Sequence, residues 1–125
     1  MRFLFLTREP RLYSMRRFQH ACLAEGHAFS TLDVLACNLV LHPKDPQIWS
    51  AGDPVGRDDV DVVVPRIGTT VTEVGCAVVN QFEVMGVPVV NTARAIQRAR
   101  DKLLSLQLLT RASVDLPRKK EWLGW

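Results

Sequence analysis

Short, strongly apolar runs alternate along the chain with longer segments in which apolar positions recur every three or four residues. The runs are typical of strands buried on both faces of a sheet, and there are four of them: residues 2–7, 29–34, 61–64 and 87–91. The longer segments have helical periodicity: residues 14–25, 70–85 and 92–113. Strands that alternate with helices predict right-handed βαβ units, with helices on both faces of a parallel sheet.

Local signals predict where these helices begin and end. Ser14 is a candidate N-cap of the first helix, and Gly26 stands where a helix end favours a left-handed residue. Thr70 and Glu73 have the spacing of a capping box for the second helix, which Gly86 would end. Four residues predict its buried stripe: Val74, Val78, Phe82 and Met85.

Residues 35–56 are the least regular part of the chain, with several prolines and glycines. Within this part, residues 47–50 and a partner near Val55 predict a short hairpin that turns at residues 51–53. The third helical segment is expected to break near Asp101. The pattern as a whole predicts an α/β fold with an open, mainly parallel sheet of about four strands flanked by helices.

The composition is that of an ordinary globular domain, with 47% hydrophobic and 23% charged residues among 125. A net charge of +3 fits anionic small molecules, an acidic partner or a ribosomal surface. Because the cations are spread along the chain, the charge by itself does not argue for nucleic-acid binding. The three cysteines lack zinc or disulfide spacing. No signal peptide or membrane span is predicted, so we expect a cytoplasmic, soluble protein.

The loops at the carboxyl ends of the predicted strands are the natural ligand site of an open parallel sheet. Among them, the loop of Arg66, Gly68 and Thr69 is the best placed. Arg66 can bind a carboxylate through two parallel hydrogen bonds, Gly68 allows a close approach, and a helix start supplies free N–H groups. The alternative is a structural turn in which Arg66 pairs with Glu73 or another carboxylate.

A second candidate is the basic cluster near the third helical segment: Arg94, Arg98, Arg100 and Lys102. A solvated helical face is the simpler interpretation of this cluster. Other chemistry has no support in the sequence, because it contains no nucleotide-binding glycine motif, no metal-ligand cluster and no nucleophile with a partner base. No catalytic residue and no metal ligand is therefore predicted.

Four segments, in order, resemble one enzyme family: FLTREPRLYSMRRFQHACLAEGH, DVVVPRIGTTVTEVG, NQFEVMGVPVVN and RARDKLLSLQLLTRASVDLP. The chain is similar, over residues 1–117, to the N-terminal region of the RimK-like ATP-grasp ligases. The combination of PRIGT, QFE..G and ARDKL..LQLL is specific to that family, whereas DKL alone recurs across ATP-grasp enzymes. The resemblance implies a pre-ATP-grasp domain.

Family members use ATP to convert a carboxylate into an acyl phosphate, which an amine attacks to form an amide. The resemblance implies that glutamate is added to the C-terminus of a small-subunit ribosomal protein, with ATP and magnesium as cofactors of the full-length enzyme. It further implies that Lys102 reaches the nucleotide phosphates. Arg66, Gly68 and Thr69 match a loop that faces the cleft between domains, where they would bind the substrate carboxylate.

Residues 118–125, RKKEWLGW, depart from the family pattern and are interpreted as a truncation or frameshift remnant. Without the ATP-grasp catalytic domain, the chain is expected to hold no cofactor and to catalyse nothing alone. The alternative function is a stand-alone carboxylate-binding or assembly module, and a third is an inactive relic. Exposed apolar surface at the face where a catalytic domain would dock would favour a homo-oligomer.

Overall fold

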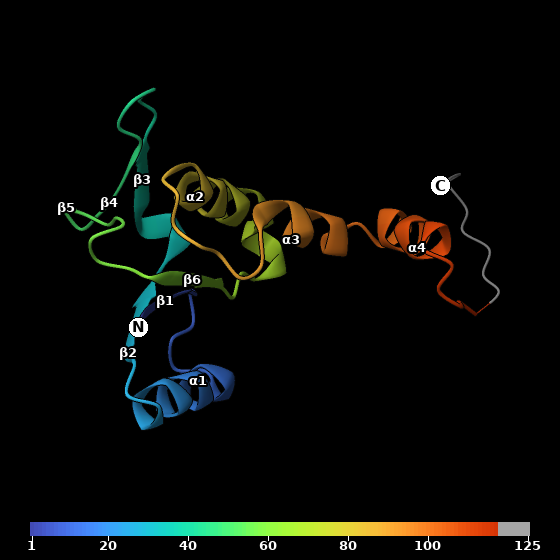
Figure 1. The fold of residues 1–125 in the computed structure, drawn as a ribbon, viewed down its shortest axis with the longest axis horizontal. Coiled ribbons are helices and arrows are strands. Elements are labelled where there is room, and N and C mark those ends of the chain that lie inside the picture. Colours follow the sequence, from blue (N-terminus) through green and yellow to red (C-terminus); the bar gives the residue numbers. More distant parts are fainter. Residues whose placement is uncertain (118–125) are drawn as a thin grey trace.

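The computed structural model describes residues 1–117, and its centre is a parallel sheet (Figure 1). The sheet has three strands in the order β2-β1-β6: β1 Arg2–Leu6, β2 Ala28–Leu32 and β6 Val62–Pro65. Leu4 in the central strand lies opposite Ser30 on one side and Val63 on the other. The predicted open, parallel α/β architecture is therefore confirmed.

The fourth predicted strand, residues 87–91, is reduced to a single parallel bridge beside β6. The N–H group of Val63 donates to the carbonyl oxygen of Pro88, and its carbonyl accepts from the N–H group of Val90, both at 2.9 Å. Pro88 has no N–H group to extend the ladder, and the chain soon enters helix α3 Ala93–Arg100. Pairing therefore stops after one residue pair.

Two helices cover opposite faces of the sheet: α1 Tyr13–Ala24 and α2 Thr72–Val84 (Figure 1). The central strand β1 serves both faces because successive side chains point in opposite directions. Phe5 lies with its ring centroid 5.0 Å from that of Phe18 on α1. Leu4 and Leu6 belong instead to the main core, together with residues of β6 and α2: Val63, Val78, Val79 and Phe82.

A small antiparallel sheet lies beside α2, with the order β3-β4-β5: β3 Cys37–Val40, β4 Gln47–Ser50 and β5 Asp53–Pro54. The predicted hairpin of β4 and β5 is confirmed. Ala51 and Gly52 have φ angles of 52° and 86°, and two positive values in a row define a tight turn that matches strand twist. Strand β3, which follows the short 3₁₀ helix η1 Val34–Ala36, was not predicted.

The predicted helix C-termini are confirmed, whereas the first N-cap is wrong. Gly26 and Gly86 follow α1 and α2 with φ angles of 76° and 75°, the left-handed conformation expected there. Helix α1 begins at Tyr13, so Ser14 lies inside its first turn. The N-cap is Leu12, and it makes no side-chain capping bond.

The predicted capping box of α2 does not form. A 3₁₀ turn, η2 Thr69–Val71, precedes the helix, so that Thr70 lies in this turn and not at the helix boundary. The hydroxyl of Thr72 donates to the carbonyl oxygen of Thr69 at 3.1 Å. The 3₁₀ turn η2 therefore stands where the reciprocal hydrogen bonds between Thr70 and Glu73 were expected.

The buried stripe of α2 is displaced from the predicted one. Val78 and Phe82 are buried as predicted and Met85 is partly buried, but Val74 is 45% exposed. Gly75 takes its place on the buried side, directly against the side chain of Ile67. The loop after β6 packs against α2 at Gly75, so the buried stripe includes Gly75 in place of the neighbouring Val74.

The third helical segment breaks at Asp101 as predicted, into α3 and α4 Lys102–Arg111. Figure 1 shows these helices extending away from the sheet as an arm. Helix α4 contains no buried residue. Within residues 1–117, no helix combines the length and apolarity needed to cross a membrane. The interpretation of residues 118–125 concerns a segment outside the described residues.

Candidate functional site

A pocket of about 400 Å³ lies at the carboxyl ends of the parallel strands. Thr7 follows β1, Arg66 follows β6, and Asn91 follows the single bridge beside β6. All three line the pocket because the carboxyl ends of parallel strands meet at one edge of the sheet. The start of α1 and one side of α3 complete its wall. The size lies within the range usual for small-molecule sites.

The polar lining of this pocket contains cations and neutral groups but no carboxylate: Thr7, Ser14, Arg66, Asn91 and Arg100. The remaining lining is mostly apolar and includes Met15, Ile67 and Ile96. Arg66, Asn91 and Arg100 are exposed, so the pocket is open to solvent, and the cations and N–H donors that converge there attract anions. The lining therefore suits a small carboxylate or phosphate that carries an aliphatic part.

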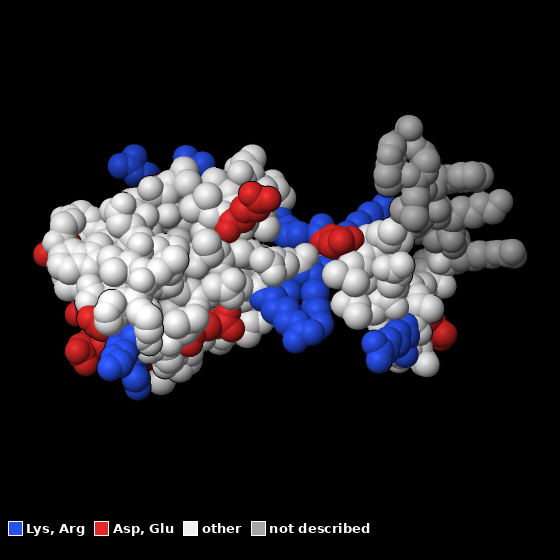
Figure 2. All heavy atoms as spheres, turned by 90° about the horizontal axis from the view of Figure 1, so that it is seen from above, with Lys and Arg blue, Asp and Glu red and all other residues white. Residues whose placement is uncertain are grey.

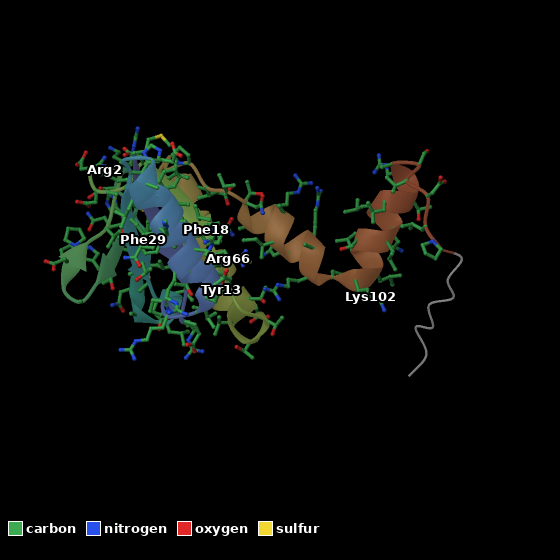
Figure 3. The ribbon with its side chains drawn as sticks, turned by 90° about the horizontal axis from the view of Figure 1, so that it is seen from below. Arg2, Tyr13, Phe18, Phe29, Arg66 and Lys102 are labelled. Carbon is green, nitrogen blue, oxygen red and sulfur yellow. The ribbon has the colours of Figure 1, made fainter. Side chains whose placement is uncertain are left out.

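Arg66 is held by the sheet through its backbone and by α1 through its side chain. Its N–H group donates to the carbonyl oxygen of Leu6 at 2.8 Å. Its guanidinium carbon lies 5.5 Å from the ring centroid of Phe18, a cation–π contact that Figure 3 shows. Among residues 1–117 no ion pair joins Arg66 to Glu73 or to another carboxylate. The ion pair expected by the structural interpretation of this loop therefore does not form in residues 1–117.

The loop after Arg66 presents open backbone to solvent. A Cβ atom added to Gly68 would meet nothing within 4 Å, and its φ of −71° is open to any residue. Within the described part of the chain, the N–H groups of Gly68 and Thr69 donate to no acceptor. These donors are the type that binds anions before a helix. Thr69 itself does not line the pocket.

The predicted basic cluster is divided by the fold. Figure 2 shows Lys and Arg side chains gathered over α3, between the body and α4. Arg100 turns toward the body, where its guanidinium donates to the carbonyl oxygen of Ile67 at 2.5 Å and lines the pocket. Arg94 and Arg98 are exposed and do not line it. Sequence reasoning placed Arg100 in the cluster but could not separate it from its neighbours.

Lys102 is the first residue of α4 and does not line the pocket, and Figure 3 shows it on the arm, apart from Arg66. The preceding Asp101 has a structural role, because its side chain accepts from the N–H group of Leu104 at 2.9 Å. The hydroxyl of Ser105 donates to the carbonyl oxygen of Arg98 at 2.6 Å, across the break. These bonds fix where Lys102 stands.

The QFE..G motif is explained by the fold. The Gln81 side chain donates to the carbonyl oxygens of Val40 and Gln47, at 2.9 and 3.1 Å, and so fastens the small sheet to α2. Phe82 is fully buried. The Glu83 carboxylate accepts from the first N–H group of α3, that of Ala93, at 3.1 Å. Through these contacts α2 positions both the hairpin and the helix that carries Arg100.

Two of the three thiols are poor nucleophiles, and the acidic residues of the described chain form no metal site. Burial, with a smaller effect of Asp33, raises the pKa of Cys37 to about 11, and burial also raises the pKa of Cys76. Raised pKa values weaken a thiol as a nucleophile. Residues 1–117 contain no group of three or more side chains placed to hold a metal ion.

A second pocket, of about 520 Å³, lies between the hairpin and the end of α2. Its lining mixes cations with acids, among them Lys44, Arg57, Asp45 and Asp58. It was not predicted, because these residues are scattered through the irregular segment. The mixed charge does not favour one class of ligand, whereas the first pocket does.

Comparison with known proteins places these features in a family. The model of the family described as "RimK PreATP-grasp domain" matches residues 1–96. The "Probable alpha-L-glutamate ligase 1" of Pseudoalteromonas atlantica is 44% identical over 118 residues, and that of Pseudomonas putida strain GB-1 is 46% identical over 117. Each alignment covers 94% of this chain and 38% of the relative. The chain thus spans well under half the length of these relatives.

Two solved structures share the fold. The RimK domain protein ATP-grasp from Sphaerobacter thermophilus matches with a TM-score of 0.65 and 25% identity, over 94% of this chain and 40% of that one. The ATP-grasp ligase PsnB, complexed with precursor peptide PsnA2 and AMPPNP, matches with a TM-score of 0.67 and 19% identity, over 94% and 45%. From sequence and fold together, this chain belongs to the RimK pre-ATP-grasp domain family.

Proposed function

We propose that this chain is the N-terminal unit of a RimK-like ATP-dependent carboxylate–amine ligase and needs an ATP-grasp catalytic domain to act. The proposed reaction adds glutamate to the C-terminus of a small-subunit ribosomal protein. The γ-phosphoryl group of ATP passes to a carboxylate and ADP leaves. The amine nitrogen then attacks the acyl phosphate, an amide bond forms, and inorganic phosphate leaves. The glutamate ligase names of the relatives support this choice.

The observation that carries the proposal is the acid-free pocket at the strand ends. Arg66 enters it without a carboxylate partner in the described chain, beside the open N–H groups of Gly68 and Thr69. Arg66 is exposed, and a guanidinium without a carboxylate partner can bind a carboxylate through paired, charge-assisted hydrogen bonds. We assign this loop to the substrate carboxylate, as one wall of a cleft that a catalytic domain would close.

ATP and magnesium belong, in this proposal, to the catalytic domain. The described residues hold no cluster suited to magnesium and no glycine-rich phosphate loop. Lys102 is the one residue here assigned to the nucleotide phosphates, by analogy with the DK pair of the family. When bound, ATP supplies the phosphoryl group, and Lys102 would offset phosphate charge from the first turn of α4.

The surface of helix α4 indicates that another protein part packs against this chain. It carries leucines on every side, and none of them is buried: Leu103, Leu104, Leu106, Leu108 and Leu109. The other five residues of α4 are polar, but leucines that stay unburied favour contact with another protein surface. We assign its surroundings to the catalytic domain. Residues 1–117 then form the pre-ATP-grasp unit, and a homo-oligomer that covers α4 is the alternative arrangement.

The carboxylate site is tested by titrating the isotopically labelled 125-residue chain with glutamate and following its amide NMR signals. We expect the signals of Gly68 and Thr69 to shift, and Arg66→Ala to weaken binding by about tenfold or more, because a charge-assisted pair is lost. Arg94→Ala removes an equal charge from α3, outside the pocket, and serves as control. Unchanged affinity in folded Arg66→Ala would contradict the assignment.

The same chain, incubated with ATP and glutamate, is expected to release no ADP above background. Such release from the chain alone would contradict the need for a catalytic domain. Glutamate binding combined with this inactivity also fits a stand-alone carboxylate-binding module, the second candidate. The acid-free pocket is consistent with both functions. The test that distinguishes them is whether this chain supports activity when it replaces the matching segment of a complete ligase.

A further inference from the structure

We propose that Arg100 is a second anion-binding residue of the pocket, which therefore selects a ligand with two carboxylates joined by a short aliphatic chain. The inference rests on the proposed function, which assigns one carboxylate to the loop of Arg66. It adds a residue that determines specificity. Such a pocket would bind glutamate more tightly than glutamine, because the two differ only in the group at the end of the side chain.

The two guanidinium groups reach the pocket from different elements. Arg66 follows β6 and rests on Phe18 of α1, whereas Arg100 is the last residue of α3. Figure 1 places α1 and α3 on opposite sides of β6. The two cations therefore reach the same pocket from two elements, the end of β6 and the end of α3.

Arg100 is positioned before any ligand arrives. Its guanidinium donates to the carbonyl oxygen of Ile67, the residue directly after Arg66, at 2.5 Å. This bond uses one nitrogen of a planar group that has further N–H donors, so the remaining donors are free to bind a carboxylate. A cation held in place in advance loses less entropy when it binds.

The charge of the pocket is uncompensated within the described chain. Neither Arg66 nor Arg100 forms an ion pair there, and no acidic residue lines the cavity. Both guanidinium groups are exposed and line the same pocket, where like charges repel each other. One carboxylate would neutralise only one of them, whereas a dicarboxylate would neutralise both. The energetic gain from the second carboxylate is the physical basis of the proposed selectivity.

The lining between the cations suits the aliphatic part of such a ligand. Ile67, Ile96 and Ala99 supply apolar side chains, and Thr7, only 6% exposed, adds a hydroxyl at the strand end. Methylene groups gain from burial against such residues. A pocket of about 400 Å³ has room for a molecule of the size of glutamate.

The test compares glutamate with glutamine in the NMR titration of the 125-residue chain. Both ligands carry the α-carboxylate, and only glutamate carries the second one. We expect the wild-type chain to bind glutamate about tenfold more tightly than glutamine. Arg100→Gln keeps a donor for Ile67 but removes the charge. It should weaken glutamate binding about tenfold and leave glutamine binding nearly unchanged.

Two further variants complete the design. Arg98→Gln makes the same change on the same helix outside the pocket, so it should keep the wild-type preference. Arg100→Lys keeps the charge and should keep most of the preference. Equal affinities for the two ligands in the wild type, or an unchanged preference in folded Arg100→Gln, would overturn this inference alone. Failure of both ligands to bind would overturn the carboxylate pocket itself.

Discussion

Gly75 shows how a single residue shapes the pocket from outside its lining. It lies at the end of the first turn of α2, where glycine costs up to about 1 kcal/mol relative to alanine. A Cβ atom added there would stand 2.5 Å from a side-chain carbon of Ile67. The carbonyl of Ile67 in turn holds Arg100. Glycine is therefore required for the close approach of the loop to the helix.

We predict that Gly75→Ala lowers the free energy of unfolding by about 1–3 kcal/mol, because overpacking against Ile67 outweighs the better helix propensity. Chemical denaturation measures the change. Gly68→Ala is the matched control, since a Cβ atom there meets nothing within 4 Å. It should change stability by less than about 1 kcal/mol. An equally stable Gly75→Ala would show that the loop is free to move.

The ion pair of Arg2 and Asp61 gives the fold a pH dependence. The guanidinium of Arg2 donates to the Asp61 carboxylate at 2.9 Å, and the N–H group of Arg2 donates to it at 2.6 Å. The side-chain bond from Arg2, helped by the backbone bond, lowers the pKa of Asp61 from 3.8 to about 2. The pair closes the start of β1 against the segment before β6.

Because the pKa of Asp61 is lower in the folded state, its contribution is complete above 3.8 and is lost as the pH falls through about 2. We predict that the stability advantage of the wild type over Asp61→Asn shrinks across this window. Denaturation midpoints measured at a series of pH values follow the change. Asp53→Asn, at an exposed hairpin position without an ion pair in residues 1–117, serves as control. A constant difference across the window would contradict the assignment.

At the scale of elements, α2 organises what surrounds it. Gln81 is 5% exposed and bonds to carbonyl oxygens of β3 and β4, and Glu83 holds the first turn of α3. One helix therefore fixes the small sheet and the helix of Arg100 relative to the parallel sheet. The QFE..G motif, one of those that carry the family resemblance, therefore has a structural role in this fold.

Loss of the Gln81 amide should loosen this arrangement. We predict that Gln81→Leu costs about 1–3 kcal/mol of stability, because two carbonyl oxygens lose their buried donor. Thermal or chemical unfolding measures the cost. Gln107→Leu changes an exposed glutamine of α4 in the same way and should stay within about 0.5 kcal/mol. If the two variants proved equally stable, the anchoring role of Gln81 would be refuted.

Elements with strong local signals were predictable from the sequence. The runs of valine and leucine in β1 and β6 have the density of strands buried on both faces, and Gly26 and Gly86 mark helix ends that need a left-handed residue. The hairpin turn followed from Gly52 and its neighbours. Each of these features depends on a few adjacent residues.

Features that depend on tertiary contacts were not predictable. Thr70 and Glu73 have capping-box spacing, but the 3₁₀ turn that packs before α2 removes the boundary they would cap. Arg94, Arg98 and Arg100 look alike in sequence, and only the turn of α3 toward Ile67 distinguishes Arg100. The residues that line the pocket come from segments far apart in the chain.

At the scale of the whole molecule, the features form a binding wall with an exposed arm. The pocket lies at the strand ends. The arm of α3 and α4 extends away from the sheet (Figure 1) and carries Lys102 and unburied leucines. Most ligands of open α/β sheets bind in a crevice at this edge. The proposed ligase function therefore requires a second domain that contacts both the pocket and the arm.

The most direct test is the glutamate-dependent release of ADP by a chimera. In it, residues 1–117 of this chain replace the matched segment of the Pseudomonas putida relative, and the assay contains ATP and the acceptor that this relative uses. We expect activity in the chimera and none in the 125-residue chain. A folded chimera without activity, beside an active natural relative, would contradict the claim that this chain is the N-terminal unit of such a ligase.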